Sequence, residues 1–320
     1  MTIARHACPL SSAGSGSRAG CVFPSGAAAP RFWGGGLLAA AIGLLGLVVA
    51  TLPARAEVLD RTGFKLTFSY DFKDFVPPKA DDVGHMAGPW TTVFWYNPGN
   101  VGDHTLPGNS ELQLYVDPQY KGTAERPFGL NPFHKTEKGL SIVASEFPAN
   151  VLPHAWGYRY QSGLLTTRKT FSQQFGYFEL RAKPPSSPGA WPAFWLLPQD
   201  GRWPPEIDVF EMCCKDAALY NVALHWGTPQ DHKRDGKYFN VADLSKDFHL
   251  FGVKWTKDEI CFYLDDVKTF CGRADEQFST PMYMLINLAL VDPKRTVSPD
   301  SQFRLPAAFE LDYVRAYSLE

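Results

Sequence analysis

Three carboxylic acids lie close together in the segment 204–212: Glu206, Asp208 and Glu211. Side chains alternate between the two faces of a β-strand, so Glu206 and Asp208 share one face. Strict alternation would send Glu211 to the apolar face, where an unpaired carboxylate is costly to bury. One extra residue in a β-bulge around 209–210 would return Glu211 to the face of Glu206, and bulges are common beside active sites. The segment therefore predicts a row of three carboxylates on one face.

Such a row suits glycoside hydrolysis. Like charges a few ångströms apart cannot all ionise at neutral pH, so at least one pKa is raised. Hydrolysis needs one ionised carboxylate and one protonated carboxyl, and a separation of about 5 to 5.5 Å favours the retaining route. Residues on one strand with a same-face residue between them fall roughly in that range. The alternative interpretation is a solvent-facing acidic edge strand.

The elements around this segment are predicted to be strands. From Gly63 onward, short apolar or alternating runs are separated by Gly, Pro, Asn and Asp, and no stretch shows a comparably clear helical period. The predicted strands are 65–70, 112–116, 140–144, 176–182, 221–226, 250–255, 260–264, 282–288 and 309–317. We expect an all-β fold, a concanavalin-like β-jelly-roll sandwich of two curved antiparallel sheets. The long loops 71–89, 97–109 and 120–132 are expected to wall a groove across the concave sheet.

The N-terminus has the order of a secretory signal peptide. Residues 1–56 hold four arginines and no acidic residue, and an uncharged run at 34–52 precedes Ala54-Arg55-Ala56. We predict a signal peptide at 1–56 and one catalytic domain at 57–320, in a secreted or periplasmic protein with no membrane contact after cleavage. The alternative is an uncleaved anchor, because 19 uncharged residues are just long enough to span a bilayer.

Charge and length narrow the function further. Without the four arginines the chain has 27 basic and 33 acidic residues, a formal charge of −6, so nothing attracts nucleic acid. The length of the predicted mature chain suits one all-β domain, expected to be a monomer.

Four cysteines follow the predicted cleavage site, and an even number in an exported protein permits disulfides. Cys261 and Cys271 flank a run that is typical of a hairpin, so a cross-strand bridge between them is geometrically reasonable. Three arrangements stay open for Cys213 and Cys214: a bond to each other, bonds elsewhere, or buried thiols.

The run Glu206-Ile207-Asp208-Val209-Phe210-Glu211 resembles the bulged signature of glycoside hydrolase family 16, of the laminarinase and lichenase type. The likeness covers nearly the whole predicted mature chain, at 109–115, 162–167, 175–183, 191–198, 248–255 and 312–317. In character it is nearest to bacterial endo-1,3-1,4-β-glycanases that trim exopolysaccharide. The resemblance implies a β-jelly roll and retaining endo-hydrolysis of β-glucans or galactans. It also implies Glu206 as nucleophile, Glu211 as general acid/base, and Asp208 hydrogen-bonded between them.

A glycan groove needs aromatic platforms beside hydrogen-bonding groups. Trp191 and Trp195 share one strand face just before the carboxylate strand, and we expect one in the core and the other in the groove. His225 follows on a neighbouring strand, where a sugar contact and a structural role both stay open.

The resemblance adds further candidates. Asn109 and Glu111 match positions that often contact the non-reducing side of the cleavage point. Arg168 is a looser candidate for substrate binding, and an exposed surface arginine is the more economical account. Asp312 matches a carboxylate that holds a structural calcium (Ca2+) in some members, with a salt bridge as its alternative. No cofactor is expected to be required for catalysis.

We therefore predict an exported endo-β-glycanase acting on β-glucan or exopolysaccharide. Two alternatives remain: a non-catalytic carbohydrate-binding jelly roll, and a transglycosylase that uses the same covalent intermediate. The crowded carboxylates argue against the first, because binding alone gives no reason to place three like charges together.

Overall fold

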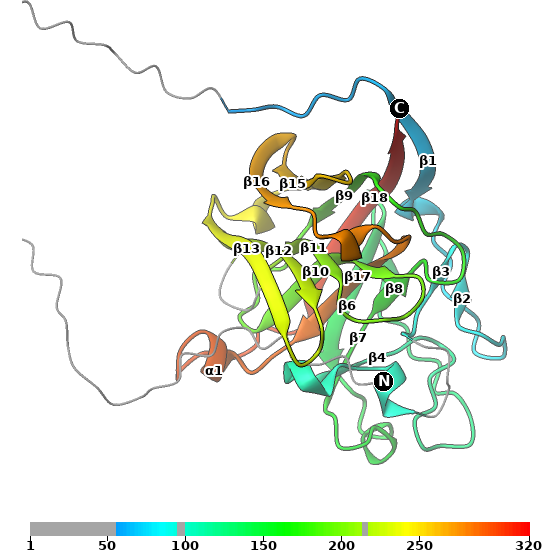
Figure 1. Cartoon of the computed structure of the whole chain (residues 1–320). Coiled ribbons are helices and arrows are strands. Elements are labelled where there is room, and N and C mark those ends of the chain that lie inside the picture. The colour runs from blue at the N-terminus through cyan, green and yellow to red at the C-terminus, as the bar shows by residue number, and fades with distance from the viewer. Residues whose placement is uncertain (1–55, 95–99, 213–216) are drawn as a thin grey trace, which may run out of the picture. The chain divides into compact units, whose positions relative to one another are not determined.

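The computed structural model describes residues 56–94, 100–212 and 217–320. It contains two β-sheets (Figure 1). The first sheet has ten strands in the order β16-β15-β14-β9-β18-β6-β7-β4, with β1 beside β18 and β5 beside β6. Its strands are β1 (Phe64–Asp71), β4 (Gln113–Tyr115), β5 (Phe133–Lys135), β6 (Leu140–Glu146), β7 (Tyr160–Ser162), β9 (Gly176–Lys183), β14 (His249–Trp255), β15 (Glu259–Leu264), β16 (Val267–Arg273) and β18 (Ala307–Leu319).

The second sheet has eight strands in the order β13-β12-β11-β10-β17-β8-β3-β2. Its strands are β2 (Met86–Ala87), β3 (Trp90–Thr91), β8 (Leu164–Thr166), β10 (Ala190–Pro198), β11 (Glu206–Glu211), β12 (Leu219–Gly227), β13 (His232–Asn240) and β17 (Met282–Leu290). Helices in the described ranges are short: α1 (Pro293–Thr296) and the 3-10 turns Phe72–Asp74, Val101–Asp103, Pro107–Asn109, Leu152–His154, Leu244–Lys246 and Glu276–Phe278. None of these helices is long and apolar enough to cross a membrane.

The main hydrophobic core is built from residues of both sheets. Phe178 and Phe251 of the first sheet and Ile207 and Phe210 of the second are all buried in it. The rings of Phe210 and Phe251 stack with centroids 3.9 Å apart, which ties the carboxylate strand to the opposite sheet. The predicted all-β jelly-roll sandwich is confirmed. One pair departs from antiparallel order, because β4 runs parallel to β7.

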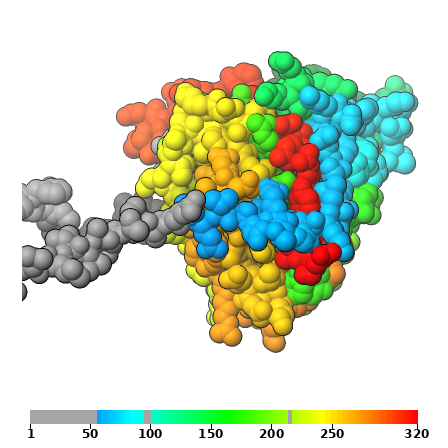
Figure 2. Space-filling view, turned by 90° about the horizontal axis from the view of Figure 1, so that it is seen from above, coloured from blue at the N-terminus to red at the C-terminus, as the bar shows by residue number. Residues whose placement is uncertain are grey.

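The first described residues attach to the β15–β16 hairpin. Val58 forms a bridge with Val267, and the carbonyl oxygen of Glu57 accepts a 2.9 Å hydrogen bond from the backbone of Lys268. Figure 2 shows the blue N-terminal part of the fold lying against the hairpin, in yellow and orange, and continuing as β1 beside β18, in red. The start of the predicted mature chain is thus part of the fold, whereas residues 1–55 of the predicted signal peptide (1–56) lie outside the described residues.

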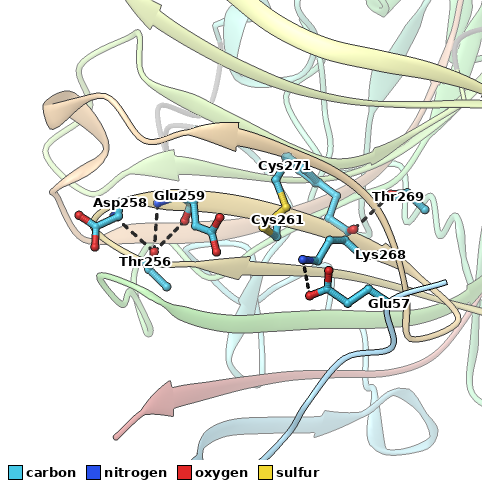
Figure 3. The surroundings of a disulfide bond; sticks show 9 residues. Glu57, Thr256, Asp258, Glu259, Cys261, Lys268, Thr269 and Cys271 are labelled. Atoms are coloured by element: carbon cyan, nitrogen blue, oxygen red, sulfur yellow. Dashed lines mark hydrogen bonds and ion pairs between the residues drawn. A yellow bond between two sulfur atoms is a disulfide. The ribbon is translucent and has the colours of Figure 1, made fainter. Parts of the chain in front are cut away.

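The same hairpin carries a disulfide. Cys261 and Cys271 are directly opposite residues of β15 and β16, with Cα atoms 4.1 Å apart, and their predicted bridge is confirmed (Figure 3). Asp265 and Asp266 close the hairpin with φ angles of 51° and 63°. Two positive φ angles are typical of the type I′ turn that matches the twist of a hairpin. Cys213 and Cys214 lie outside the described residues, so the three arrangements considered for them stay open.

Candidate active site

The carboxylate strand β11 contains the predicted β-bulge. Asp208 pairs with Ala223 of β12 and Glu211 pairs with Asn221, so three residues along β11 span the length of two residues along β12. The pairing of β11 with β10 shifts register at the same place. Val209 and Phe210 are consequently both buried in the core. Glu211 returns to the face of Glu206, and both line one cavity. The bulge prediction is confirmed.

The cavity lies on the face of the second sheet that points away from the main core. Central strands β10, β11 and β17 supply most of its wall, and the segment 106–111 before β4 covers one side. The lining residues are Leu106, Asn109, Glu111, Trp191, Ala193, Trp195, Glu206, Glu211, Asn287 and Ala289. Carboxylates, indoles and amides therefore meet over a few apolar side chains, a composition suited to the polar edges and apolar faces of a sugar.

Glu206 is buried, with 5% of its surface exposed. Its Oε2 atom accepts a 2.6 Å hydrogen bond from the indole Nε1 of Trp203, and its carboxyl group also hydrogen-bonds Asp208. Burial raises its pKa well above the usual range, and the charge of Asp208, the bond to Asp208 and the charge of Glu211 add to this. The Trp203 donor opposes the rise because it stabilises the ionised carboxylate.

Glu211 accepts two hydrogen bonds of 2.9 Å, one from Nε1 of Trp191 and one from Nδ2 of Asn221. Burial, followed by the negative charge of Asp208, raises its pKa to about 8, although both donors act in the opposite direction. Burial thus favours the protonated form of Glu211. This is the protonation state that a general acid requires.

Asp208 is held from the side of β12. Its Oδ2 atom lies 2.9 Å from Nε2 of His225, and Nδ1 of His225 lies 2.9 Å from Nε2 of His232. The two imidazole rings are parallel to within 4°. Trp203 packs against His232 with ring centroids 5.1 Å apart, so the donor to Glu206 and the partner of Asp208 support each other.

The two candidate tryptophans both line the cavity, and both are also buried in hydrophobic clusters outside the main core, Trp195 beside Leu164 and Trp191 beside Ala289. The indole Nε1 of Trp195 donates a 2.7 Å hydrogen bond to Oδ1 of Asn287, whose Nδ2 donates to the hydroxyl of Tyr115 at 2.9 Å. Trp191, Ala193 and Trp195 alternate along the central strand β10 and line the cavity, while Phe194 between them faces the main core. Trp191 and Trp195 are therefore on the same side.

Asn109 and Glu111 also line the cavity, as the resemblance suggested. Glu111 accepts hydrogen bonds from the backbone of Leu106 at 3.1 Å and from Nε2 of Gln113 at 2.8 Å. Burial raises the pKa of Glu111 to about 7. Of the three predicted loops, only 97–109 contributes to the lining in the described part of the chain.

Two other candidates lie elsewhere. His225 is outside the cavity lining, and its two ring nitrogens hydrogen-bond Asp208 and His232. Arg168 also lies outside it, with its guanidinium 5.8 Å from the ring centre of Tyr283. The contacts of His225 thus fit a residue that positions the carboxylate of Asp208 rather than one that contacts a sugar.

The structural calcium at Asp312, whose other ligands would be backbone carbonyls, stays a prediction. The carboxylate of Asp312 forms an ion pair with the guanidinium of Arg181. Calcium takes six to eight oxygen ligands. In the described ranges Asp312 belongs to no group of three clustered His, Cys, Asp or Glu ligand atoms. The salt bridge considered as the alternative is present.

Trp203 and Asn221 hydrogen-bond the carboxylate row, and His232 reaches it through His225, but none of the three was predicted from the sequence as a site residue. The sequence could have indicated Trp203 as a site residue, since its indole N–H is a hydrogen-bond donor only three residues before Glu206. Asn221 was assigned only to a strand. His232 begins a polar edge strand that the pattern does not indicate.

The raised pKa of Glu211 predicts a stability effect of the Glu211→Gln substitution. Between pH 4.5 and about 8 the unfolded chain releases this proton while the folded chain keeps it, so folded stability falls as pH rises. Glutamine removes that loss. We expect the melting temperature of Glu211→Gln to exceed that of the wild type by a few degrees, about 2–4 °C per kcal/mol, with a gain that grows from pH 5 to pH 8.

Differential scanning calorimetry across this pH range measures the effect. Glu259→Gln, at an exposed position of β15, controls for the loss of one acidic charge. A melting-temperature difference between Glu211→Gln and wild type that is constant with pH would contradict the assignment of a raised pKa to Glu211.

Comparison with known proteins agrees with the geometry. The model of the family described as Glycosyl hydrolases family 16 matches residues 129–302. The chain is 39% identical over 262 residues to the endo-1,3-1,4-beta-glycanase EglC of Rhizobium meliloti (strain 1021), covering 82% of this chain and 53% of that protein. It is 37% identical, with the same coverage, to the endo-1,3-1,4-beta-glycanase ExsH of that organism. The chain thus spans about half the length of these curated relatives.

The structure is similar to that of the endo-beta-1,3-glucanase from Pyrococcus furiosus, with a TM-score of 0.62 and 25% sequence identity. The match covers 82% of this chain and 98% of that chain. The family match extends over more than half of the sequence and includes the bulged carboxylate strand. The predicted resemblance is confirmed, and the chain belongs to glycosyl hydrolases family 16.

Proposed function

We propose that this chain is an exported, retaining endo-β-glycanase that hydrolyses β-1,3- or β-1,4-linked glucan or bacterial exopolysaccharide. The observation that carries the proposal is the bulge in β11, which brings Glu206 and Glu211 to one cavity with Asp208 between them. The names of EglC and ExsH support a β-glycan substrate. The N-terminal sequence pattern supports export.

In the first step, the ionised carboxylate of Glu206 attacks the anomeric carbon of the bound sugar. The glycosidic C–O bond breaks, and Glu211 gives its proton to the departing oxygen, leaving a covalent glycosyl ester on Glu206. In the second step, Glu211 accepts a proton from a water molecule that attacks the same carbon. The bond to Glu206 then breaks, and both carboxyl groups regain their starting protonation.

Asp208 lets Glu206 carry a charge in a buried place. Burial and like charge leave the neighbouring pair Glu206 and Asp208 with a shared proton, since two adjacent buried carboxylates do not both ionise. The indole N–H of Trp203 donates a 2.6 Å hydrogen bond to Glu206 and therefore favours the negative charge on Glu206 rather than on Asp208. His225 fixes the orientation of Asp208 from the other side.

The experiment that tests this function measures new reducing ends and the loss of viscosity on lichenan, laminarin, agar and an acidic exopolysaccharide. An endo-acting enzyme lowers viscosity early, before many reducing ends appear. Proton NMR of the first products tests retention, because a retaining enzyme releases the β-anomer from a β-glycan. Initial release of the α-anomer, or no cleavage of any β-glycan, would refute the proposal.

The two indole donors predict separate effects on the pH profile. Trp203→Phe removes a donor that stabilises ionised Glu206, so the pKa of Glu206 rises and the acidic limb of kcat/KM moves to higher pH. Trp191→Phe removes a donor to Glu211, so the basic limb moves to higher pH instead. We expect shifts of about one to two pH units, the size of one hydrogen bond to a charged group.

These two substitutions control for each other, since each replaces an indole by a phenyl ring beside the same cavity. Profiles of kcat/KM from pH 4 to 10 on one soluble β-glucan make the comparison. If Trp203→Phe moved only the basic limb, or Trp191→Phe only the acidic limb, the assigned roles of Glu206 and Glu211 would be reversed.

A further inference from the structure

The edge strand β13 extends the face of the second sheet that carries the carboxylates (Figure 1). Glu206 pairs with His225 of β12, and His225 pairs with Arg234 of β13. Directly opposite residues of antiparallel strands have their side chains on the same face. Arg234 therefore lies on the face of Glu206, two strands away.

A second row begins at the other end of the carboxylate strand. Glu211 pairs with Asn221, and Asn221 pairs with Tyr238. Tyr238 is consequently on the carboxylate face as well. Neighbouring strands are about 4.8 Å apart, so β13 lies roughly 10 Å from β11. That distance suits a neighbouring sugar of a bound chain rather than the sugar at the cleavage point.

Arg234 and Tyr238 form one exposed pair. The guanidinium carbon of Arg234 lies 5.6 Å from the centre of the Tyr238 ring, and the Tyr238 side chain is 40% exposed. In the part of the chain that the structure describes, no carboxylate forms an ion pair with Arg234. The charge of Arg234 also reaches the catalytic row, since it lowers the pKa of Glu211 against the effect of burial.

The other two cations of β13 face the opposite side. Lys233 pairs with Trp226 and Lys237 with Val222, and both partners alternate with residues of the carboxylate face. The amine of Lys237 lies 5.3 Å from the ring centre of Phe239. Arg234 is thus the basic residue that β13 presents to the cavity side, in a chain whose predicted mature form has a net negative charge.

We propose that Arg234 and Tyr238 form a subsite for a carboxylate-bearing sugar of the glycan, next to the cleavage point on the β13 side. The guanidinium binds the carboxylate with two parallel N–H donors, and the exposed tyrosine ring packs against the apolar face of a sugar. The inference rests on the proposed function and names its substrate class: a β-glycan that carries acidic groups.

The test compares one polymer in two charge states. Lichenan is neutral, and partial oxidation of its primary hydroxyl groups to carboxylates gives an acidic form with the same backbone linkages. The measured quantity is the ratio of kcat/KM on oxidised lichenan to kcat/KM on neutral lichenan, at low ionic strength. We expect the wild type to prefer the oxidised polymer, with a preference that weakens as salt is added.

Arg234→Ala is expected to lower this ratio about fivefold, chiefly through KM, which is the size of a partly exposed bidentate ion pair. Arg234→Lys keeps the charge but not the two parallel donors, so it should give an intermediate ratio. Tyr238→Ala should lower kcat/KM on both polymers, because packing against a ring face does not depend on the carboxylate.

Lys237→Ala is the matched control, since it removes the same charge from the same strand on the opposite face. It should leave the ratio unchanged. Equal ratios for Arg234→Ala and Lys237→Ala, or no wild-type preference for the oxidised polymer, would overturn the subsite.

Failure of the proposed function gives a different result, in which the wild type cleaves neither polymer. In that case affinity electrophoresis of the wild type and Arg234→Ala in gels containing each polymer still tests the subsite. Selective retardation of the wild type by oxidised lichenan supports it, and equal retardation of both proteins overturns it.

Discussion

Glu206→Gln is expected to fold and to bind polymer, but to lose kcat on the order of 10⁴-fold or more. The amide has nearly the shape of the carboxylate and still offers an oxygen to the indole of Trp203, so the site keeps its packing. It cannot form the glycosyl ester, because an amide oxygen is a far weaker nucleophile than a carboxylate. Reducing-end release from β-glucan measures the loss, and circular dichroism with affinity electrophoresis measures folding and binding.

Glu259→Gln is the matched control, because it makes the same chemical change at an exposed strand position far along the chain. A second variant tests the role of Glu206 directly. Glu206→Ala leaves space beside the anomeric carbon, so added azide should restore turnover of an activated aryl β-glycoside and give an α-glycosyl azide. Near-normal hydrolysis by Glu206→Gln, or a β-azide from Glu206→Ala, would refute Glu206 as the nucleophile.

The carboxylate strand was predictable because two physical demands meet in it. Glu211 lies at an odd distance from Glu206 and Asp208, so simple alternation would bury it with Ile207. The cost of burying that charge predicts the bulge, and the register of β11 with both neighbours confirms it. The apolar runs predicted the core strands for the same reason: a period of two with one buried face leaves few alternatives.

Strand β13 was not predicted, because its sequence His232–Asn240 lacks an alternating pattern. An edge strand pairs on one side only, and most of its side chains are exposed on both faces, so little hydrophobic pattern is needed. Gly236 lies in its middle, where an added Cβ would come within 2.4 Å of the Val222 carbonyl oxygen. The places of His232 and Arg234 depend on this strand, and they were missed with it.

The polar network around the cavity depends on tertiary contacts that spacing does not encode. Asn287 joins Trp195 to Tyr115, a residue 172 positions away in the sequence. Alternation shows that Trp191 and Trp195 share a face, but not which face is the core. That choice is made by Phe194 and its neighbours, which pack against the first sheet.

Glu211→Ala is expected to lower kcat/KM on β-glucan by about 10² to 10⁴-fold, the range for loss of a general acid. The wild-type basic limb should lie near pH 8, where Glu211 loses its proton, and the variant should lose that limb. An aryl glycoside whose leaving group needs no proton should form the glycosyl ester at a rate close to wild type and then stall at hydrolysis.

Azide separates this role from that of the nucleophile. In Glu211→Ala the ester on Glu206 still forms, so azide should attack it and release a β-glycosyl azide, the opposite configuration from Glu206→Ala. Burst kinetics on the aryl glycoside measure the two steps, and Glu259→Gln again controls for loss of an acidic charge. Equal losses on aryl glycoside and polymer, with an unchanged basic limb, would show that Glu211 is not the proton donor. The stereochemical contrast holds only if both carboxylates face one anomeric carbon, which is the arrangement that the bulge in β11 creates.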